Sequence, residues 1–312
     1  MVQEITRDIK SLDFAKRNLT ASINSLNRLH MLIAGVESLK NMSEKRQYRD
    51  AAYLLQALNH IIPEFDRFSD MKKIKEIYDE FRKTQILLKR QIREEFSDFC
   101  STKQTVFTVE VKKLLHDACL VLEALGEEVV ADLVDWLIRL ELNEYKIIFS
   151  PNSEASDLNK VKRRYTWCKR VVSNFEECWA DVFPASWKLS KKLFLMFCAW
   201  CRKDLSNLLK QNEDSLSVKL LLLLIGETLT FEKHLATRFP TFPEAKETEF
   251  EGIISSCFEA YMNIYVEAQE KILSTLVEEA VSDAKKTQKS FPVEKNALLS
   301  LGTAKNNIYY IE

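Results

Sequence analysis

Two cysteines three residues apart, Cys198 and Cys201, form the single C-x-x-C pattern in the sequence. Such a pair binds zinc when a second pair of ligands is present, and takes part in redox exchange when it follows a strand. The sequence offers neither context, because the pair sits inside a strongly helical apolar segment. We interpret both residues as buried thiols on one apolar face. His116 and Cys119 lack two further ligands, and we interpret them as core or surface residues.

Paired carboxylates are the next candidates for chemistry, and the acidic doublets considered are Glu127-Glu128, Glu176-Glu177 and Glu278-Glu279. Neighbouring residues of a helix lie on different faces, and none of the doublets has the Glu-x-x-His partner of a di-iron bundle. The sequence also lacks the D-D-x-x-D pattern of helical isoprenoid synthases and the glycine-rich loops that bind phosphate. We therefore expect a non-enzymatic protein without cofactor or metal, and keep an all-helical enzyme with an unrecognised site as a further hypothesis.

A basic run interleaved with Tyr165 and Trp167 is the last group that could bind a ligand. It could contact an acidic helix, or anionic lipid head groups with about 1 kcal/mol per cation near a membrane surface. A solvated helix face with Trp167 packed inward is the commoner origin of such a charge run. The candidate binding face comprises Lys160, Lys162, Arg163, Arg164, Lys169 and Arg170.

The composition predicts the kind of fold that positions these residues. Five glycines and six prolines among 312 residues are too few for the frequent turns of a sheet protein. A net charge of −1 with both signs mixed gives no indication of nucleic-acid binding. Seven cysteines, an odd number, fit a reducing compartment. The apolar run Leu220–Ile225 is far shorter than the ~20 residues of a membrane span. We expect a cytosolic all-α protein.

The first 33 residues carry an apolar heptad repeat, which indicates a coiled-coil helix. Lys16 and His30 interrupt the apolar a positions, and a polar a residue fixes register and partner choice at a cost in stability. The e and g positions are mostly small or uncharged, which suits a bundle of different helices better than a two-stranded zipper. No cap precedes the repeat, so we expect the helix to extend upstream of Met1. The seam consists of Val2, Ile5, Ile9, Leu12, Lys16, Leu19, Ile23, Leu26, His30 and Ile33.

After Leu26 a displaced stripe of Leu29, Leu32, Val36 and Leu39 replaces the heptad, as expected where a helix leaves its coiled coil. Gly35 and the polar residues 41–46 should then interrupt the rod. We expect an assembly segment at 1–40, a rod of antiparallel helices at 41–286 and a loosely structured tail at 287–312. Ser186 and either Asp214 or Ser215 are the expected caps of two helices, and 220–225 should be deeply buried. The expected helices are Tyr48–Ile62, Met71–Phe99, Leu114–Gly126, Val129–Phe149, Leu158–Trp179, Trp187–Leu209, Leu216–Phe239 and Phe250–Ala284.

Three blocks of the sequence resemble one protein family. VQEITRDIKSLDFAKRNLTASINSLNRLHML is similar to the coiled-coil segment of the vacuolar protein sorting-associated protein fifty-three family. KRRYTWCKRVVSNFEECWADVFPASW resembles its middle region, and FEGIISSCFEAYMNIYVEAQEKILSTLVEE a later one. The matches follow the family's order and span about residues 2–282. The resemblance implies a helical rod with further coiled coil before Met1 and a large helical region after Glu312, where membrane-side targeting would be expected.

The resemblance also implies a function. Proteins of this family are subunits of the Golgi-associated retrograde protein tethering complex, in which N-terminal coiled coils of four subunits gather into the assembly core. The complex captures endosome-derived carriers at the trans-Golgi network with SNAREs and small GTPases, and a related endosomal recycling complex shares the subunit. We therefore expect a peripheral protein on the cytoplasmic face of trans-Golgi and endosomal membranes that joins its partners through the seam. The alternative is a helical scaffold or membrane-surface module that binds anionic lipid or an acidic partner through the basic face at 160–170.

Overall fold

The computed structural model describes residues 2–101, 108–151, 153–240 and 249–288, and these residues form helices and connecting turns without a strand. The all-α fold class is thus confirmed. The α-helices are α1 (Val2–Glu44), α2 (Tyr48–Ile61), α3 (Lys72–Ser101), α4 (Val109–Leu125), α5 (Glu127–Glu141), α6 (Asn143–Ile148), α7 (Val161–Cys178), α8 (Leu189–Gln211), α9 (Val218–Arg238) and α10 (Met262–Gln288). Short 3-10 helices are η1 (Ile62–Phe68), η2 (Glu154–Ser156), η3 (Leu158–Lys160), η4 (Ala185–Trp187), η5 (Glu213–Ser215) and η6 (Ser255–Tyr261).

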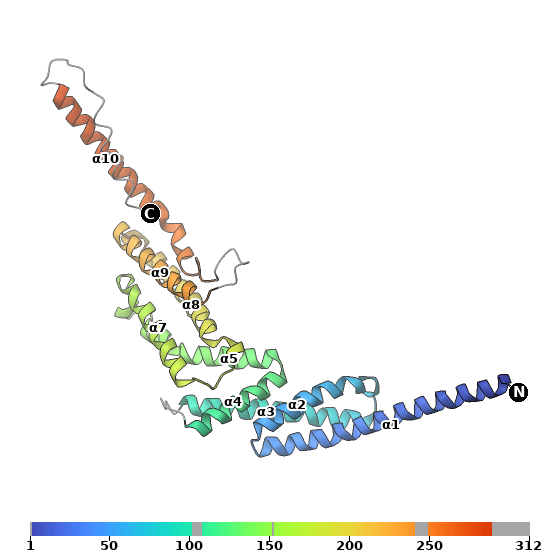
Figure 1. Ribbon diagram of the computed structural model, residues 1–312. Coiled ribbons are helices and arrows are strands. Elements are labelled where there is room, and N and C mark those ends of the chain that lie inside the picture. The colour runs from blue at the N-terminus through green and yellow to red at the C-terminus, as the bar shows by residue number, and fades with distance from the viewer. Residues whose placement is uncertain (1, 102–107, 152, 241–248, 289–312) are drawn as a thin grey trace.

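The molecule is elongated and bent, with a helix projecting at each end (Figure 1). The second half of α1 packs with α2, α3 and α4 in one bundle, and α7, α8 and α9 pack together in a second. α5 contacts both α4 and α8, and so joins the two bundles. The first half of α1 extends beyond the first bundle, and α10 extends beyond the second (Figure 1). Antiparallel helices joined by short turns place most chain neighbours side by side.

The displaced stripe of α1 is the part that enters the first bundle. Leu32, Val36 and Leu39 are buried and Leu29 is half-buried, as their spacing predicts. These four residues occupy heptad positions g and c, so they point away from the seam at a and d. One helix therefore presents two apolar stripes in succession, and its second stripe is covered by α2 and α3.

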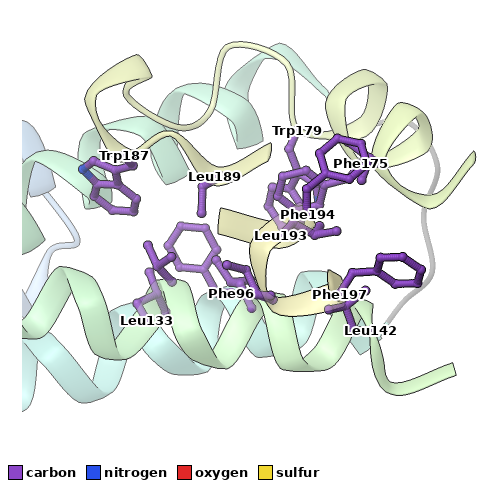
Figure 2. Packing of buried hydrophobic residues seen from close by; sticks show 14 of the residues in the cluster. Phe96, Leu133, Leu142, Phe175, Trp179, Trp187, Leu189, Leu193, Phe194 and Phe197 are labelled. Carbon is purple, nitrogen blue, oxygen red and sulfur yellow. The ribbon is translucent and has the colours of Figure 1, made fainter. Parts of the chain in front are cut away.

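Aromatic side chains connect the two bundles. Phe96 of α3 lies 5.7 Å from Phe183 and 6.1 Å from Trp179, measured between ring centroids. Figure 2 shows Phe96 in the same buried cluster as Leu133 of α5, Phe175 of α7 and Phe194 of α8. Tilted and stacked aromatic pairs at these separations add about 0.5–1.5 kcal/mol beyond the area that they bury. The two bundles therefore share one continuous core.

Several helix ends differ from the sequence-based expectations. Ser186 does not cap α8, because the backbone at Lys188 turns into the left-handed region (φ 49°) and α8 begins at Leu189. Ser217, rather than Asp214 or Ser215, caps α9 by accepting a hydrogen bond from the amide of Leu220 at 3.2 Å. The helix expected to run on to Phe149 breaks at Leu142, where α6 follows α5.

The expected burial of residues 220–225 is wrong for one side of α9. Leu221 and Leu224 are fully buried, but Leu222 and Leu223 are about half exposed. An apolar run predicts burial only when neighbouring helices surround the whole helix, and here α7 and η6 cover part of it. The boundary expected at residue 40 falls inside α1, which continues to Glu44. The predicted tail at 287–312 lies outside the described residues apart from its first two positions.

Gly35 does not interrupt α1 as expected; it lets α1 approach α2. A Cβ at Gly35 would lie 2.7 Å from Cδ2 of Leu58, which is buried. We expect Gly35→Leu to lower the free energy of unfolding by about 1–3 kcal/mol, because it overpacks this crossing. Urea unfolding monitored by circular dichroism measures the change.

The matched control is Gly226→Leu on α9, where a new Cβ meets no atom within 4 Å. This change removes a helical glycine without a clash and should leave stability unchanged or raise it by up to about 1 kcal/mol. Equal losses for both variants would contradict the close crossing of α1 and α2.

Candidate protein-interaction surface

The predicted seam lies on the exposed half of α1. Ile9, Leu12, Leu19, Ile23 and Leu26 have exposed fractions between 49% and 70%. Lys16 and His30 are exposed as well, and Ile33 is exposed at the edge of the first bundle. The side chains of Val2 and Ile5 lie outside the described residues. A row of large apolar side chains in water marks a surface that another molecule covers.

Local contacts hold the projecting helix together without covering the seam. Arg17 forms an i,i+4 ion pair with Asp13 at 2.9 Å, and Thr20 donates to the carbonyl oxygen of Lys16 at 2.9 Å. Arg28 pairs with Glu64 of η1 where α1 reaches the bundle. Exposed pairs of this kind contribute only about 0.2–0.5 kcal/mol each. The helix depends on its continuity with the buried half of α1 and has apolar surface left to bury.

A second row of exposed apolar side chains lies on α10, at the other end of the molecule (Figure 1). The sequence analysis predicted an amphipathic helix here. It did not predict that the apolar face of this helix is exposed, with no described residues packed over it. Part of the signal is in the spacing, because apolar pairs recur every four residues from 272 to 281. The row comprises Val266, Ile272, Leu273, Leu276, Val277 and Val281.

The C-terminal arm consists of η6 and α10. Its start is held by a buried carboxylate, which the sequence analysis did not identify. Glu232 of α9 is 2% exposed and accepts hydrogen bonds from the amides of Ile254 and Ser255 at 2.7 and 2.8 Å. The hydroxyl of Ser255 donates to its other oxygen at 2.8 Å. A carboxylate that accepts bonds from amides at the start of a short helix satisfies donors that would otherwise be buried without partners.

The predicted basic face is only partly a surface, because Arg164 is buried with 1% of its side chain exposed. Its guanidinium donates to the hydroxyl of Tyr145 at 2.6 Å and to the hydroxyl of Ser156 at 3.0 Å, and it lies 3.7 Å from the carboxylate of Asp204. A residue held in this way cannot contact a membrane or an acidic helix. The inclusion of Arg164 in the binding face is therefore wrong, because its guanidinium is hydrogen-bonded inside the protein.

The other cations of the run differ in their surroundings. Lys160 pairs with Glu154, and Lys162 lies 3.2 Å from Glu227 of α9. The ammonium of Lys169 lies 5.7 Å from the ring centroid of Phe231. Arg163 and Arg170 are exposed, and Trp167 packs inward as one of the two interpretations held. Whether the exposed members bind a ligand stays a prediction, with fewer cations to support it.

The cysteine pair is buried in the second bundle, as expected. Cys198 and Cys201 are fully buried, and burial raises the pKa of Cys201 to about 12 and that of Cys198 still further. Thiols with such pKa values stay protonated at neutral pH and are poor nucleophiles and ligands. His116 lies 3.0 Å from the carbonyl oxygen of Val182. Among the described residues, no group of three or more His, Cys, Asp or Glu side chains is placed to hold a metal ion.

Over the described residues, the fold and the surface together define an elongated all-helical rod with an exposed apolar helix at each end (Figure 1). Within the described ranges, none of these helices has the length and apolar character needed to cross a membrane.

Comparison with known sequences specifies the family. A family model described as "Vps53, N-terminal" matches residues 1–285. "Vacuolar protein sorting-associated protein 53 A" of Arabidopsis thaliana is 34% identical over 339 residues, covering 91% of this chain and 41% of the relative. "Vacuolar protein sorting-associated protein 53 homolog" of Caenorhabditis elegans is 35% identical over 283 residues and covers 90% of this chain and 34% of the relative. The Saccharomyces cerevisiae protein is 28% identical and covers 87% and 33%.

The chain therefore belongs to the Vps53 family. It spans between a third and about two-fifths of the length of these three relatives. No solved structure matches the chain significantly. The resemblance inferred from the three sequence blocks is confirmed.

Removal of Arg164 should destabilise the protein. Arg164→Ala leaves the hydroxyls of Tyr145 and Ser156 without their buried partner, and we expect a loss of about 3 kcal/mol in the free energy of unfolding. The exposed neighbour provides the control, since Arg163→Ala should change stability by less than about 0.5 kcal/mol. Urea titrations of both variants measure the two values. Similar small effects would show that Arg164 is solvated after all.

The raised thiol pKa values predict low reactivity. At pH 8 a thiol with a pKa of about 12 is ionised in roughly one molecule in ten thousand, so Cys201 should resist iodoacetamide in the folded chain. Because the pKa is raised, reactivity should increase only as pH rises toward that value or as the protein unfolds. Peptide mass spectrometry after alkylation with and without urea measures this. Rapid native labelling of Cys198 and Cys201 would contradict their burial.

Proposed function

We propose that this chain is a non-enzymatic subunit of a multisubunit vesicle-tethering complex, and that it assembles through the seam of α1. The complex acts in retrograde transport from endosomes to the trans-Golgi network and in endosomal recycling. The exposure of the seam is the observation that carries the proposal. Membership of the Vps53 family supports it, since the relatives are named for vacuolar protein sorting.

The composition of the seam suits association with unlike helices. Full burial of a leucine side chain contributes about 1.5–3 kcal/mol, so Leu12, Leu19 and Leu26 together provide enough to hold a partner helix. The exposed Lys16 and His30 occupy a positions, where a polar side chain favours partners that can solvate or pair it. The partners are then other subunits of the complex in a hetero-oligomer rather than a second copy of this chain.

The proposal also includes a cellular location and further partners of the complex. We propose that the protein acts at the cytoplasmic face of trans-Golgi and endosomal membranes, as a peripheral component held by the assembled complex. SNAREs and small GTPases are further partners of that complex. The mixed surface charge gives no support for nucleic-acid binding.

Glutamate substitution of the seam tests the proposal. The triple change Leu12→Glu, Leu19→Glu and Leu26→Glu should abolish co-purification of the other tether subunits from cells that express the tagged chain. Charges at d positions cannot be buried in a coiled coil without partners. Because these side chains are exposed in the chain alone, its thermal unfolding and helix content should stay unchanged.

The matched control carries the same added charge away from the seam. Phe14→Glu, Ala21→Glu and Asn24→Glu change exposed positions f, f and b of the same helix, and they should leave assembly intact. Subunits that remain bound to the seam variant would sink the assembly proposal. So would equal loss in both variants, since that would indicate a general effect on α1.

A further inference from the structure

A groove opens between α1 and α3 where the seam reaches the first bundle. Its volume is about 350 Å³. Its apolar floor is formed by Ile33 and Val36 from α1 and Ile77 from α3, and charged residues of both signs form its walls. The lining residues are Ile33, Val36, Glu37 and Lys40 of α1, and Lys73, Glu76, Ile77 and Glu80 of α3.

The groove continues the heptad register of the seam. His30 and Ile33 are the last a and d residues of the seam, and Glu37 and Lys40 are the next ones. Seven residues fall about 20° short of two full turns of a helix, so an a/d stripe drifts slowly around it. On α1 this drift moves the stripe toward the side that carries Val36, which faces the bundle. A helix that follows the seam is therefore led into the groove beside α3.

Contacts between α1 and α3 close the groove beyond this point. The ammonium of Lys40 lies 3.3 Å from a carboxylate oxygen of Glu80. Farther along, the hydroxyl of Ser43 donates to the side-chain oxygen of Gln91 at 2.9 Å. Direct contact between the two helices leaves no space for a third. The groove thus has an open end at Ile33 and a closed end at Lys40.

We propose that the partner helix that covers the seam ends in this groove, wedged between α1 and α3. An apolar side chain of the partner contacts Ile33 and Ile77, and flanking charged residues face Glu37, Lys73 and Glu76. The Lys40–Glu80 pair stops the partner, and this end point fixes the register of the whole coiled coil. The proposal rests on the proposed function, because it specifies where that interaction ends.

Hydrogen–deuterium exchange on the native complex tests this placement. The tagged chain is isolated from cells with its bound subunits and compared with the same chain purified alone. We expect amide exchange in the complex to slow at least tenfold both in residues 6–33 and in residues 72–80. Slowing in 6–33 without 72–80 would overturn the groove proposal while the seam stands. Absence of slowing in both would overturn the assembly proposal as well.

Two variants with controls test the same site by affinity. Ile77→Glu should reduce the subunits retained at least fivefold, whereas Ile86→Glu, at a position of α3 that is 68% exposed and outside the groove, should not. Because Ile77 is half-buried, thermal unfolding of each variant is measured beside retention. Unchanged retention by a folded Ile77→Glu chain would contradict the proposal.

A charge change on the exposed walls covers the case in which Ile77→Glu does not fold. Glu37→Lys with Glu76→Lys leaves the floor and the Lys40–Glu80 pair in place, and should weaken retention in low salt. The control, Glu44→Lys with Asp79→Lys, adds the same charge outside the groove and should not weaken it. Equal retention by both double variants would overturn the proposal.

Discussion

An amphipathic helix is stable only when its apolar stripe is covered, and this constraint governs the structure from α1 onward. The apolar stripe of α1 is covered in the second half of the helix and exposed in the first half. Leu32, Val36 and Leu39 are buried under α2 and α3, whereas Leu12, Leu19 and Leu26 remain in water. Since isolated helices of moderate length are marginal in water, the exposed half relies on the buried half for its order. The same helix is both a structural element of the rod and the part available to partners.

The contacts that hold the rod behind α1 together are separate from the exposed seam. Phe96 joins the two bundles through Phe183 and Trp179, and Glu232 fixes the start of the C-terminal arm. Buried aromatic contacts and a buried carboxylate with three hydrogen bonds resist bending at these two points. The two exposed apolar helices, α1 and α10, thus project from a body whose bundles are joined by buried contacts.

Periodicity in the sequence predicted most of the helices, because apolar spacing reports which side of a helix is buried. It also separated the seam of α1 from the stripe at Leu29–Leu39, since a shift from a and d to g and c is visible in the letters alone. It failed at Leu222 and Leu223, where apolar character is present but a neighbouring helix is not. Arg164 shows the opposite failure: a cation within a basic run is buried because Tyr145 and Ser156, distant in sequence, supply its partners. The α1–α3 groove could not be predicted either, because it depends on how two helices far apart in the chain are aligned.

The exposed leucines of α9 and the buried Arg164, both of which the sequence analysis placed wrongly, indicate which surfaces can bind other proteins. Charge in the sequence pointed to α7, yet Arg164 is buried and Lys160 and Lys162 are paired within the chain, so much of that charge is already matched. Apolar side chains of α1 and α10, by contrast, are exposed in the part of the chain that the structure describes. The hydrophobic effect scales with the area removed from water, while exposed ion pairs contribute little. Burial of the apolar side chains on the two projecting helices can therefore contribute more to association than the basic run of α7.

On α1 the seam also leads to a defined place, because its apolar stripe drifts into the groove between α1 and α3, which is closed at Lys40. Polar interruptions such as Lys16 and His30 contribute to register in a coiled coil, and the closed end of the groove between α1 and α3 adds a second constraint.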